Sequence, residues 1–274
     1  MAASKPGEQY VPIITKIFKD NYRKGATRVD WVRQDIVNAA DALGLRRPGN
    51  LGDVPYAFRF RRPLPDEVMD CAPKGKEWVI RLVGRGKYAF EPVKQAWFFP
   101  NASLAVTKVP DATPAIITKY ALSDEQAVLA ILRYNRLVDI FAGVTCYSLQ
   151  NHLRTTVTGV GQIETDEVYL GLDVRGAHYL LPVQAKGGTD NLSVVQIEQD
   201  FALARKPKFK TLIPRPIGAQ FVDDGEENQR IALFEFEEDS EGEILLAREK
   251  HYRLVPHDDV SATDLAKYGG RSFD

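Results

Sequence analysis

Four side chains that can bind a cation or donate to an anion lie close together in the sequence: Glu164, Asp166, Gln184 and Lys186. Carboxylate and amide oxygens accept hydrogen bonds and also bind cations, whereas a lysine ammonium donates to negatively charged groups. These groups can act together only if the chain between them folds back on itself.

The stretch from 164 to 188 has the pattern of a β-hairpin. Apolar residues alternate with others from 168 to 172, and the run from 179 to 185 is a second β-rich segment. Between these runs, Gly176 follows an arginine and is a turn signal. The sequence therefore predicts two antiparallel strands that are joined near Gly176.

The position of the turn predicts which side chains lie opposite one another. With the turn centred on Gly176, Asp166 lies opposite Lys186, and Gln184 lies opposite Val168. Because side chains alternate between the two faces of a strand, Asp166, Gln184 and Lys186 share one face. Glu164 extends the same row, so a carboxylate, an amide and an amine converge at the open end of the hairpin.

This arrangement resembles the active site of the PD-(D/E)XK nuclease superfamily, to which many type II restriction endonucleases belong. In that superfamily the first acid begins one strand, and the (D/E)-X-K triplet ends the next strand. Asp166 matches the first acid, and Gln184-Ala185-Lys186 matches the triplet. The sequence departs from the pattern in two ways, since no proline precedes Asp166 and the triplet begins with Gln. The resemblance covers about residues 120 to 225.

The resemblance implies a metal-dependent reaction. Asp166 is then the main metal ligand, the Gln184 side-chain oxygen and the Ala185 carbonyl are further ligands, and Mg²⁺ is the natural cofactor. Lys186 positions or activates the attacking water, and Glu164 compensates for the missing acid if it reaches the same ion. The expected activity is hydrolysis of double-stranded DNA at a specific sequence, which leaves 5′-phosphate and 3′-hydroxyl ends.

Other functions fit the same residues. The same core suits a nuclease of DNA repair or recombination, and an inactive hairpin suits a DNA-binding regulator. In the simplest alternative, Asp166 and Lys186 form an exposed cross-strand ion pair, which contributes about 0 to 1 kcal/mol. An enzyme that cuts both strands of a symmetric site is expected to be a homodimer.

The composition is typical of a globular protein. The chain has 274 residues, of which 44% are hydrophobic and 27% are charged, enough for one large or two ordinary domains. No stretch approaches the length of a membrane span, and the first residues lack the pattern of a secretory signal. We therefore expect no membrane partner and a cytoplasmic location. Cys71 and Cys146 match no disulfide framework or zinc spacing, so both are expected to be reduced.

Charge is distributed unevenly along the chain. Residues 1 to 110 hold 19 Lys and Arg against 11 Asp and Glu, whereas residues 111 to 274 hold 17 against 26. The segment from 92 to 114 contains four prolines and is a candidate connection between the two halves. We therefore expect a DNA-binding domain over residues 1–110 and a nuclease catalytic domain over residues 111–274.

The N-terminal half predicts helices at 11–22 and from Thr27 to Gly44, a strand at 54–62, and a hairpin at 78–90 with a basic tip. Helices followed by such a hairpin are the order of elements in a winged-helix module, whose wing touches backbone phosphates. The residues expected to contact DNA are Arg46, Arg47, Arg59, Arg61, Arg85, Lys87 and, from a later helix, Gln196 and Gln199. In the alternative, the arginines and Lys87 are simply a solvated face.

The C-terminal half predicts helices and strands in alternation. The expected elements are a helix from a capping box at Ser123 to Phe141, a helix at 145–154, a strand at 156–163, the hairpin, a helix at 192–205 that carries Asp200, and further strands to residue 253. This order suits an α/β (α+β) fold with a mixed central sheet, as expected for a restriction-endonuclease-like core.

Overall fold

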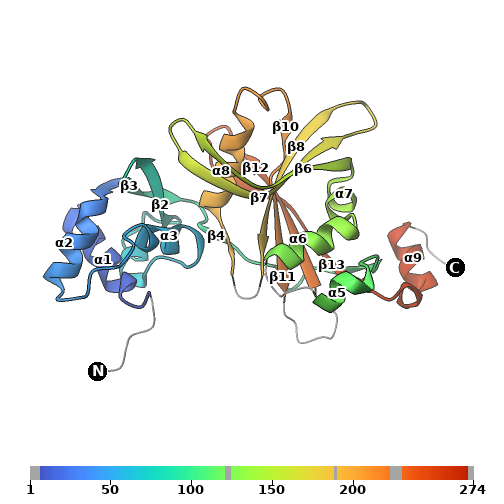
Figure 1. The fold of residues 1–274 in the computed structure, drawn as a ribbon, viewed down its shortest axis with the longest axis horizontal. Coiled ribbons are helices and arrows are strands. Elements are labelled where there is room, and N and C mark those ends of the chain that lie inside the picture. Colours follow the sequence, from blue (N-terminus) through green and yellow to red (C-terminus); the bar gives the residue numbers. More distant parts are fainter. Residues whose placement is uncertain (1–6, 121–124, 188–189, 223–229, 271–274) are drawn as a thin grey trace.

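The computed structural model describes residues 7–120, 125–187, 190–222 and 230–270. The chain has an α+β fold, in which an N-terminal part of helices and a small sheet precedes a large, curled mixed sheet with helices on its faces (Figure 1). No helix within these ranges is long and apolar enough to cross a lipid bilayer.

The N-terminal part has its own apolar core. Its elements are α1 (Tyr10–Asn21), β1 (Val29–Val32), α2 (Arg33–Ala42), α3 (Asp53–Phe60), α4 (Asp66–Met69), β2 (Glu77–Gly84) and β3 (Lys87–Val93). The strands form an antiparallel sheet in the order β1-β3-β2. Phe18 of α1 and Ile36 of α2 are fully buried against Trp78 and Phe90 of this sheet. The helices are therefore held by apolar side chains that pack against the sheet.

Two predicted elements of this part are confirmed and two differ. The helix at 11–22 and the hairpin at 78–90 are present as α1 and as β2 with β3. The helix expected from Thr27 begins only at Arg33, because the residues before it pair with β3 as β1.

The predicted strand at 54–62 is wrong, because this segment forms α3. Its aromatic residues alternate with others, so Tyr56 and Phe60 are also four residues apart, and their rings lie 5.0 Å apart on the helix. Val54 and Phe58 have the same spacing and are both buried. Residues that alternate along a strand are also four residues apart at every second repeat, and residues four apart share one face of a helix. The same pattern therefore fits both structures.

The large sheet runs in the order β5-β13-β12-β11-β8-β7-β6. These strands are β5 (Val106–Pro110), β6 (Thr145–Val157), β7 (Gly161–Leu172), β8 (His178–Lys186), β11 (Ile217–Val222), β12 (Arg230–Glu238) and β13 (Ile244–Val255), and the short β10 (Ile213–Pro214) also pairs with β8. Neighbours are antiparallel except for β8 with β11, β8 with β10, and β13 with β5, which are parallel. The sheet is therefore mixed, as predicted.

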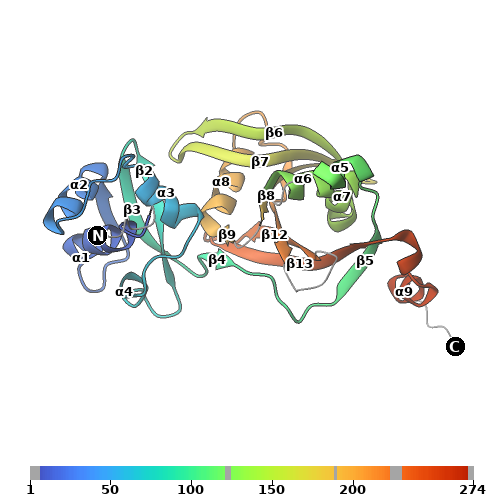
Figure 2. The same cartoon turned by 60° about the horizontal axis from the view of Figure 1, so that its bottom comes forward.

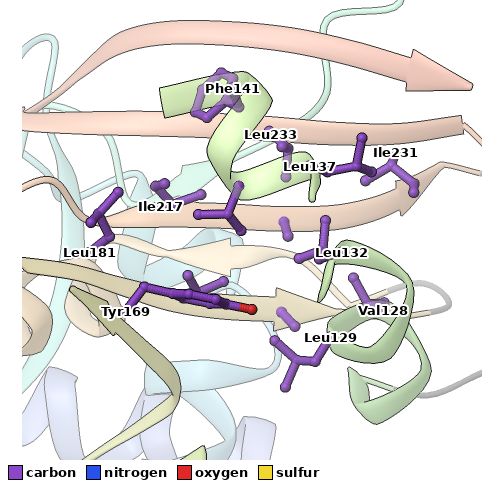
Figure 3. Packing of buried hydrophobic residues seen from close by; sticks show 14 of the residues in the cluster. Val128, Leu129, Leu132, Leu137, Phe141, Tyr169, Leu181, Ile217, Ile231 and Leu233 are labelled. Carbon is purple, nitrogen blue, oxygen red and sulfur yellow. The ribbon is translucent and has the colours of Figure 1, made fainter. Parts of the chain in front are cut away.

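Helices cover both faces of this sheet at its centre. On one face, α6 (Glu125–Tyr134) and α7 (Leu137–Ala142) bury Leu129, Leu132 and Phe141 against Leu181 and Ile217 of the strands (Figure 3). On the other face lies α8 (Val194–Ala204), the confirmed helix at 192–205. The remaining elements are α5 (Ala115–Tyr120), α9 (Ala262–Tyr268), a 3₁₀ turn (His257–Asp259), and β4 (Trp97–Phe98), which pairs with β9 (Leu192–Ser193).

Two predicted helices of this half differ from the structure. The helix expected at 145–154 is wrong, because the segment pairs along its length with β7 as β6. The helix expected to end at Phe141 is divided into α6 and α7 at Arg136, whose φ of 51° is left-handed. The capping box expected at Ser123 lies outside the described residues.

The N-terminal part and the large sheet meet along α8 and the turn between β6 and β7, which projects toward β2 (Figure 2). Arg81 of β2 pairs with Glu198 of α8, with 3.0 Å between the Arg81 Nε and a Glu198 oxygen, and it also pairs with Glu91. Leu82 packs against Gly161 in the turn. Strand β5, which ends at the expected boundary of 110, belongs to the large sheet.

Candidate functional site

The β7–β8 hairpin is present, but its register differs from the predicted one. Glu167 pairs with Val183 and Val168 pairs with Pro182, so each residue of β7 lies opposite a position two residues earlier than expected. Asp166 therefore does not lie opposite Lys186, and Val168 does not lie opposite Gln184. The described ladder between the two strands ends at Glu167, one residue after Asp166.

Strict alternation is interrupted in β7 at the position of Asp166. Ile163 packs against α8 and Thr165 donates a hydrogen bond to it, yet Val168 also packs on the α8 face. Ile163, Thr165 and Val168 thus share one face. In a regular strand Val168 would lie on the opposite face from the other two. On the neighbouring strand, His152 lies between the residues paired with Thr165 and Glu167, and its φ is 46°. The backbone is therefore irregular where the first acid lies.

Asp166 contacts the backbone of the triplet. Its Oδ2 accepts a hydrogen bond from the Ala185 N–H at 2.8 Å, and the residue is half-buried. The carboxylate of the first strand is thereby held beside the end of the second strand. This contact joins the first acid to the Gln184-Ala185-Lys186 triplet, as the sequence pattern predicted.

Gln184 turns toward α8. Its Nε2 lies 3.1 Å from each carboxylate oxygen of Asp200 and 3.2 Å from the Glu164 carbonyl oxygen, and its Oε1 accepts from Gln196 at 3.3 Å. The amide nitrogen, and not the amide oxygen, therefore faces the nearest carboxylate. For Gln184 to bind a cation there through its oxygen, the amide would have to rotate and give up these bonds.

Asp200 is an acid of the site that the predicted residue set did not contain. It is fully buried on α8, and it also accepts a hydrogen bond from the Thr165 hydroxyl at 2.7 Å. Burial raises the pKa of this carboxyl to about 8, and the negative charge of Asp166 acts in the same direction, while the bonds from Thr165 and Gln184 oppose the shift. In the sequence, the one feature that pointed to Asp200 was its position in the helix that follows the triplet.

Lys186 lies at the end of β8 and is 6% exposed. Its neighbour in the parallel ladder is Gln220, whose Nε2 donates to the Asp190 carbonyl oxygen at 3.0 Å and lies 3.3 Å from the Asn191 side chain. The alternative in which Lys186 forms an exposed ion pair with Asp166 does not describe this residue, because its side chain is buried.

Glu164 takes part in different contacts from those expected. Its carboxylate is 3.0 Å from the Arg154 guanidinium and 3.7 Å from the His152 ring, both on β6. Its side chain is therefore engaged with the edge strand of the sheet, and only its backbone oxygen contacts Gln184.

Glu167, which follows Asp166, faces the opposite side of the sheet. It is fully buried and accepts hydrogen bonds from Arg133 of α6 at 3.2 and 3.1 Å and from the Ser148 hydroxyl at 2.6 Å. These bonds connect the segment that carries Asp166 to the helix layer.

Asp166 and Asp200 are two carboxylates of this site whose charges interact. Burial is the main cause of the raised pKa of Asp200, and the charge of Asp166 adds to it; a bound cation would favour the ionised form of both groups. The set is all oxygen and has few charges, which suits Mg²⁺ because this ion keeps several waters. Within the described ranges, no group of three or more His, Cys, Asp and Glu residues is arranged to hold a metal. The two carboxylates thus fit a hydrated ion better than a cage of protein ligands.

The residues expected to contact DNA lie in different environments. Arg46, Arg61, Arg85 and Lys87 are exposed, and Arg47 is exposed but paired with Asp41 at 2.7 Å. In contrast, Arg59, Gln196 and Gln199 are buried, with exposed fractions of 9%, 9% and 4%. The two glutamines lie on α8 under the N-terminal part, and Gln196 contacts Gln184. DNA contact by each of these residues stays a prediction.

Searches of protein-family models, curated proteins and solved structures found no match to this chain.

Proposed function

We propose that the protein is a Mg²⁺-dependent endodeoxyribonuclease of the restriction type, in which Asp166, Asp200 and Lys186 form the reactive centre. The observation that carries the proposal is the bond between the Asp166 carboxylate and the Ala185 N–H, beside the buried Asp200. This contact unites the first acid and the triplet, and α8 follows as the resemblance expects. The mixed sheet with helices on both faces supports a restriction-endonuclease-like core.

The residues of the chain have distinct roles in this proposal. Asp166 and Asp200 hold the metal, and Thr165 and Gln184 orient Asp200 through the hydrogen bonds that they donate. Mg²⁺, when bound, would supply a water of lowered pKa and stabilise charge on the phosphate. Lys186 positions the attacking water and stabilises negative charge that develops on the phosphate. The products expected from the resemblance are 5′-phosphate and 3′-hydroxyl ends.

The N-terminal part would bind the DNA. Its element order of α1, β1, α2, α3, α4, β2 and β3, with the sheet order β1-β3-β2, supports a winged-helix-like domain. The exposed Arg85 and Lys87 at the β2–β3 tip would then contact backbone phosphates. Cleavage of both strands at a symmetric site would require a homodimer, which sedimentation of the protein on a specific duplex would detect.

Plasmid cleavage with Mg²⁺, followed by mapping of the ends, tests the proposal. Asp166→Asn and Lys186→Ala should each lower the single-turnover cleavage rate by a factor on the order of 100 to 1,000. Asp173→Asn is the matched control, because Asp173 is a carboxylate at the far end of the same hairpin. Discrete fragments favour a restriction enzyme, and cutting only of branched DNA favours repair. Full cleavage by Asp166→Asn or Lys186→Ala excludes this centre, and DNA binding without any cleavage by the wild type favours a regulator.

A further inference from the structure

A cavity of about 650 Å³ lies between the N-terminal part and the turn that joins β6 to β7. One wall consists of α3 and the β2–β3 tip, and the other wall consists of residues 156 to 162. Three arginines line it, Arg33, Arg59 and Arg85, and none of its lining residues is Asp or Glu. The cavity therefore carries a concentrated positive charge without a counter-charge of its own.

Arg59 is the most unusual of the three. It is 9% exposed, its Nε is buried without a hydrogen-bond partner, and its guanidinium contacts the Phe60 ring at 4.5 Å. Burial lowers its pKa to about 10, which indicates how weakly the surroundings stabilise the cation. A buried guanidinium that lacks a carboxylate is costly unless a ligand supplies the negative charge.

The carboxylate whose charge acts on Arg59 is already engaged. Glu198 lies in a neighbouring cavity that Arg59 also lines, and it is paired with Arg81. That second cavity contains several glutamates, whereas the first contains none. Arg59 thus lies between a cavity lined by both glutamates and arginines and a cavity whose charged lining residues are all arginines.

Arg33 and Arg85 are exposed, and within the described ranges neither side chain takes part in a hydrogen bond or an ion pair. Other arginines of the same region differ, because Arg28, Arg81 and Arg154 are all paired with carboxylates. Arg33 and Arg85 lie close together, since the Arg33 backbone donates to the Gly86 carbonyl and its Nε would be 3.9 Å from a Cβ at Gly86. Two guanidinium groups without a bonding partner in the described ranges and one buried group therefore line the same cavity.

From these observations, we propose that the cavity binds the phosphate group of a nucleotide, which Arg59, Arg33 and Arg85 would contact together. Guanidinium groups match the oxygens of phosphate in geometry and charge. The volume lies within the range of sites for small organic ligands, of about 300 to 1,000 Å³, and exceeds that needed for a lone anion. Tyr56, which also lines the cavity and is 45% exposed, offers a ring on which a base can stack.

This inference goes beyond the proposed hydrolysis, because none of the three arginines belongs to the centre at Asp166. A nucleoside phosphate could come from a free nucleotide or from the phosphorylated end of a DNA strand. Both sources present the same phosphate group to the arginines, so the experiment contains one arm for each.

The test is isothermal titration calorimetry on the full chain with EDTA present. The ligands are deoxyadenosine 5′-monophosphate, deoxyadenosine, and a short single strand with and without a 5′-phosphate. At least one phosphorylated ligand should bind, and removal of its phosphate should weaken binding about tenfold or more. Arg33→Ala and Arg85→Ala should each weaken binding about tenfold, and so should Arg59→Gln. Arg23→Ala is the control, because it removes one positive charge from the same domain outside the cavity.

Preference for the mononucleotide identifies a free nucleotide as the ligand, and preference for the phosphorylated strand identifies a strand end; both results support the site. Because Arg33 and Arg85 are exposed, their variants give an answer even if Arg59→Gln does not fold. The proposal is overturned if no phosphorylated ligand binds, if the phosphate makes no difference, or if Arg33→Ala and Arg85→Ala bind as the wild type does. Asp166→Ala should bind these ligands normally, so failure of the nuclease centre and failure of this cavity are distinguishable.

Discussion

Replacement of Asp200 by Asn should make the protein relatively more stable as the pH rises. The pKa of Asp200 is raised to about 8 by burial and by the charge of Asp166, whereas an Asp in an unfolded chain titrates near 3.9. A carboxyl whose pKa is raised in the folded state contributes to the free energy of unfolding. This contribution is fully present below about pH 4 and is lost as the pH rises toward 8. Asn cannot ionise, so Asp200→Asn does not suffer this loss.

The size of the effect follows from the pKa difference. Between pH 4.5 and pH 7.5 the unfolded wild type loses a proton that the folded state keeps, which costs about 1.4 kcal/mol for each of three pH units, or roughly 4 kcal/mol. The isosteric amide can still accept the Thr165 hydroxyl bond. Urea unfolding in EDTA at pH 4.5, 6.0 and 7.5 should therefore show the difference in unfolding free energy, variant minus wild type, rising by about 2 to 4 kcal/mol.

Asp173→Asn is the matched control for this experiment. Backbone N–H groups of the hairpin turn, chiefly that of Ala177, lower the pKa of Asp173 to about 2. A lowered pKa gives stability that is present above about pH 4 and is lost only below it, so the control difference should be constant from pH 4.5 to 7.5. A constant difference for Asp200→Asn as well would refute the reasoning, since Asp200 would then be ionised in the folded protein.

Three further predictions concern other parts of the chain. Arg133→Ala should destabilise the protein by about 3 kcal/mol in urea unfolding, because it leaves the buried Glu167 without its cation, and adding Glu167→Gln should restore most of the loss. Gly161→Ala should lower the melting temperature, because its φ is 99° and the new Cβ would lie 2.7 Å from Leu82; a change below 1 °C would contradict the described contact. Arg85→Ala should reduce the dependence of log K for duplex binding on log salt concentration by about one, and an unchanged slope would remove the β2–β3 tip from the DNA interface.

The sequence predicted the hairpin and α8, but it did not predict how their side chains meet. Alternation along 168 to 172 and the glycine turn are local signals, so the two strands could be inferred directly. The register could not, because it depends on the exact centre of the turn, which lies one residue earlier than Gly176, so that Leu172 pairs with His178. Near Asp166 the irregular backbone also changes which face each residue occupies. The register centred on Gly176 was therefore two residues out. Asp200 became a member of the site only through the packing of α8 on the sheet, which no local pattern specifies.

Two of the errors in secondary structure have a common physical origin. Segment 54–62 alternates like a strand and forms α3, whereas segment 145–154 resembled a helix and forms β6. In both segments tertiary contacts decide the outcome: Phe58 is buried in the N-terminal core, and β6 exists because β7 offers a partner along its length. Local preference is a weak guide where such contacts are available.

Helix α8 carries Glu198 and Asp200, which are two residues apart. Glu198 pairs with Arg81 of the N-terminal part, and Asp200 accepts a hydrogen bond from Thr165 in the large sheet. If a ligand displaced β2 and weakened the Arg81–Glu198 pair, the helix that carries Asp200 would lose a contact with the N-terminal part. Because thermodynamic linkage is reciprocal, a cation bound at the carboxylates would then alter the affinity of the N-terminal part for that ligand by the same factor. In the proposed nuclease, DNA recognition and hydrolysis would then be coupled through α8, and a substitution at Arg81 would weaken the coupling without removing a residue of the acid site.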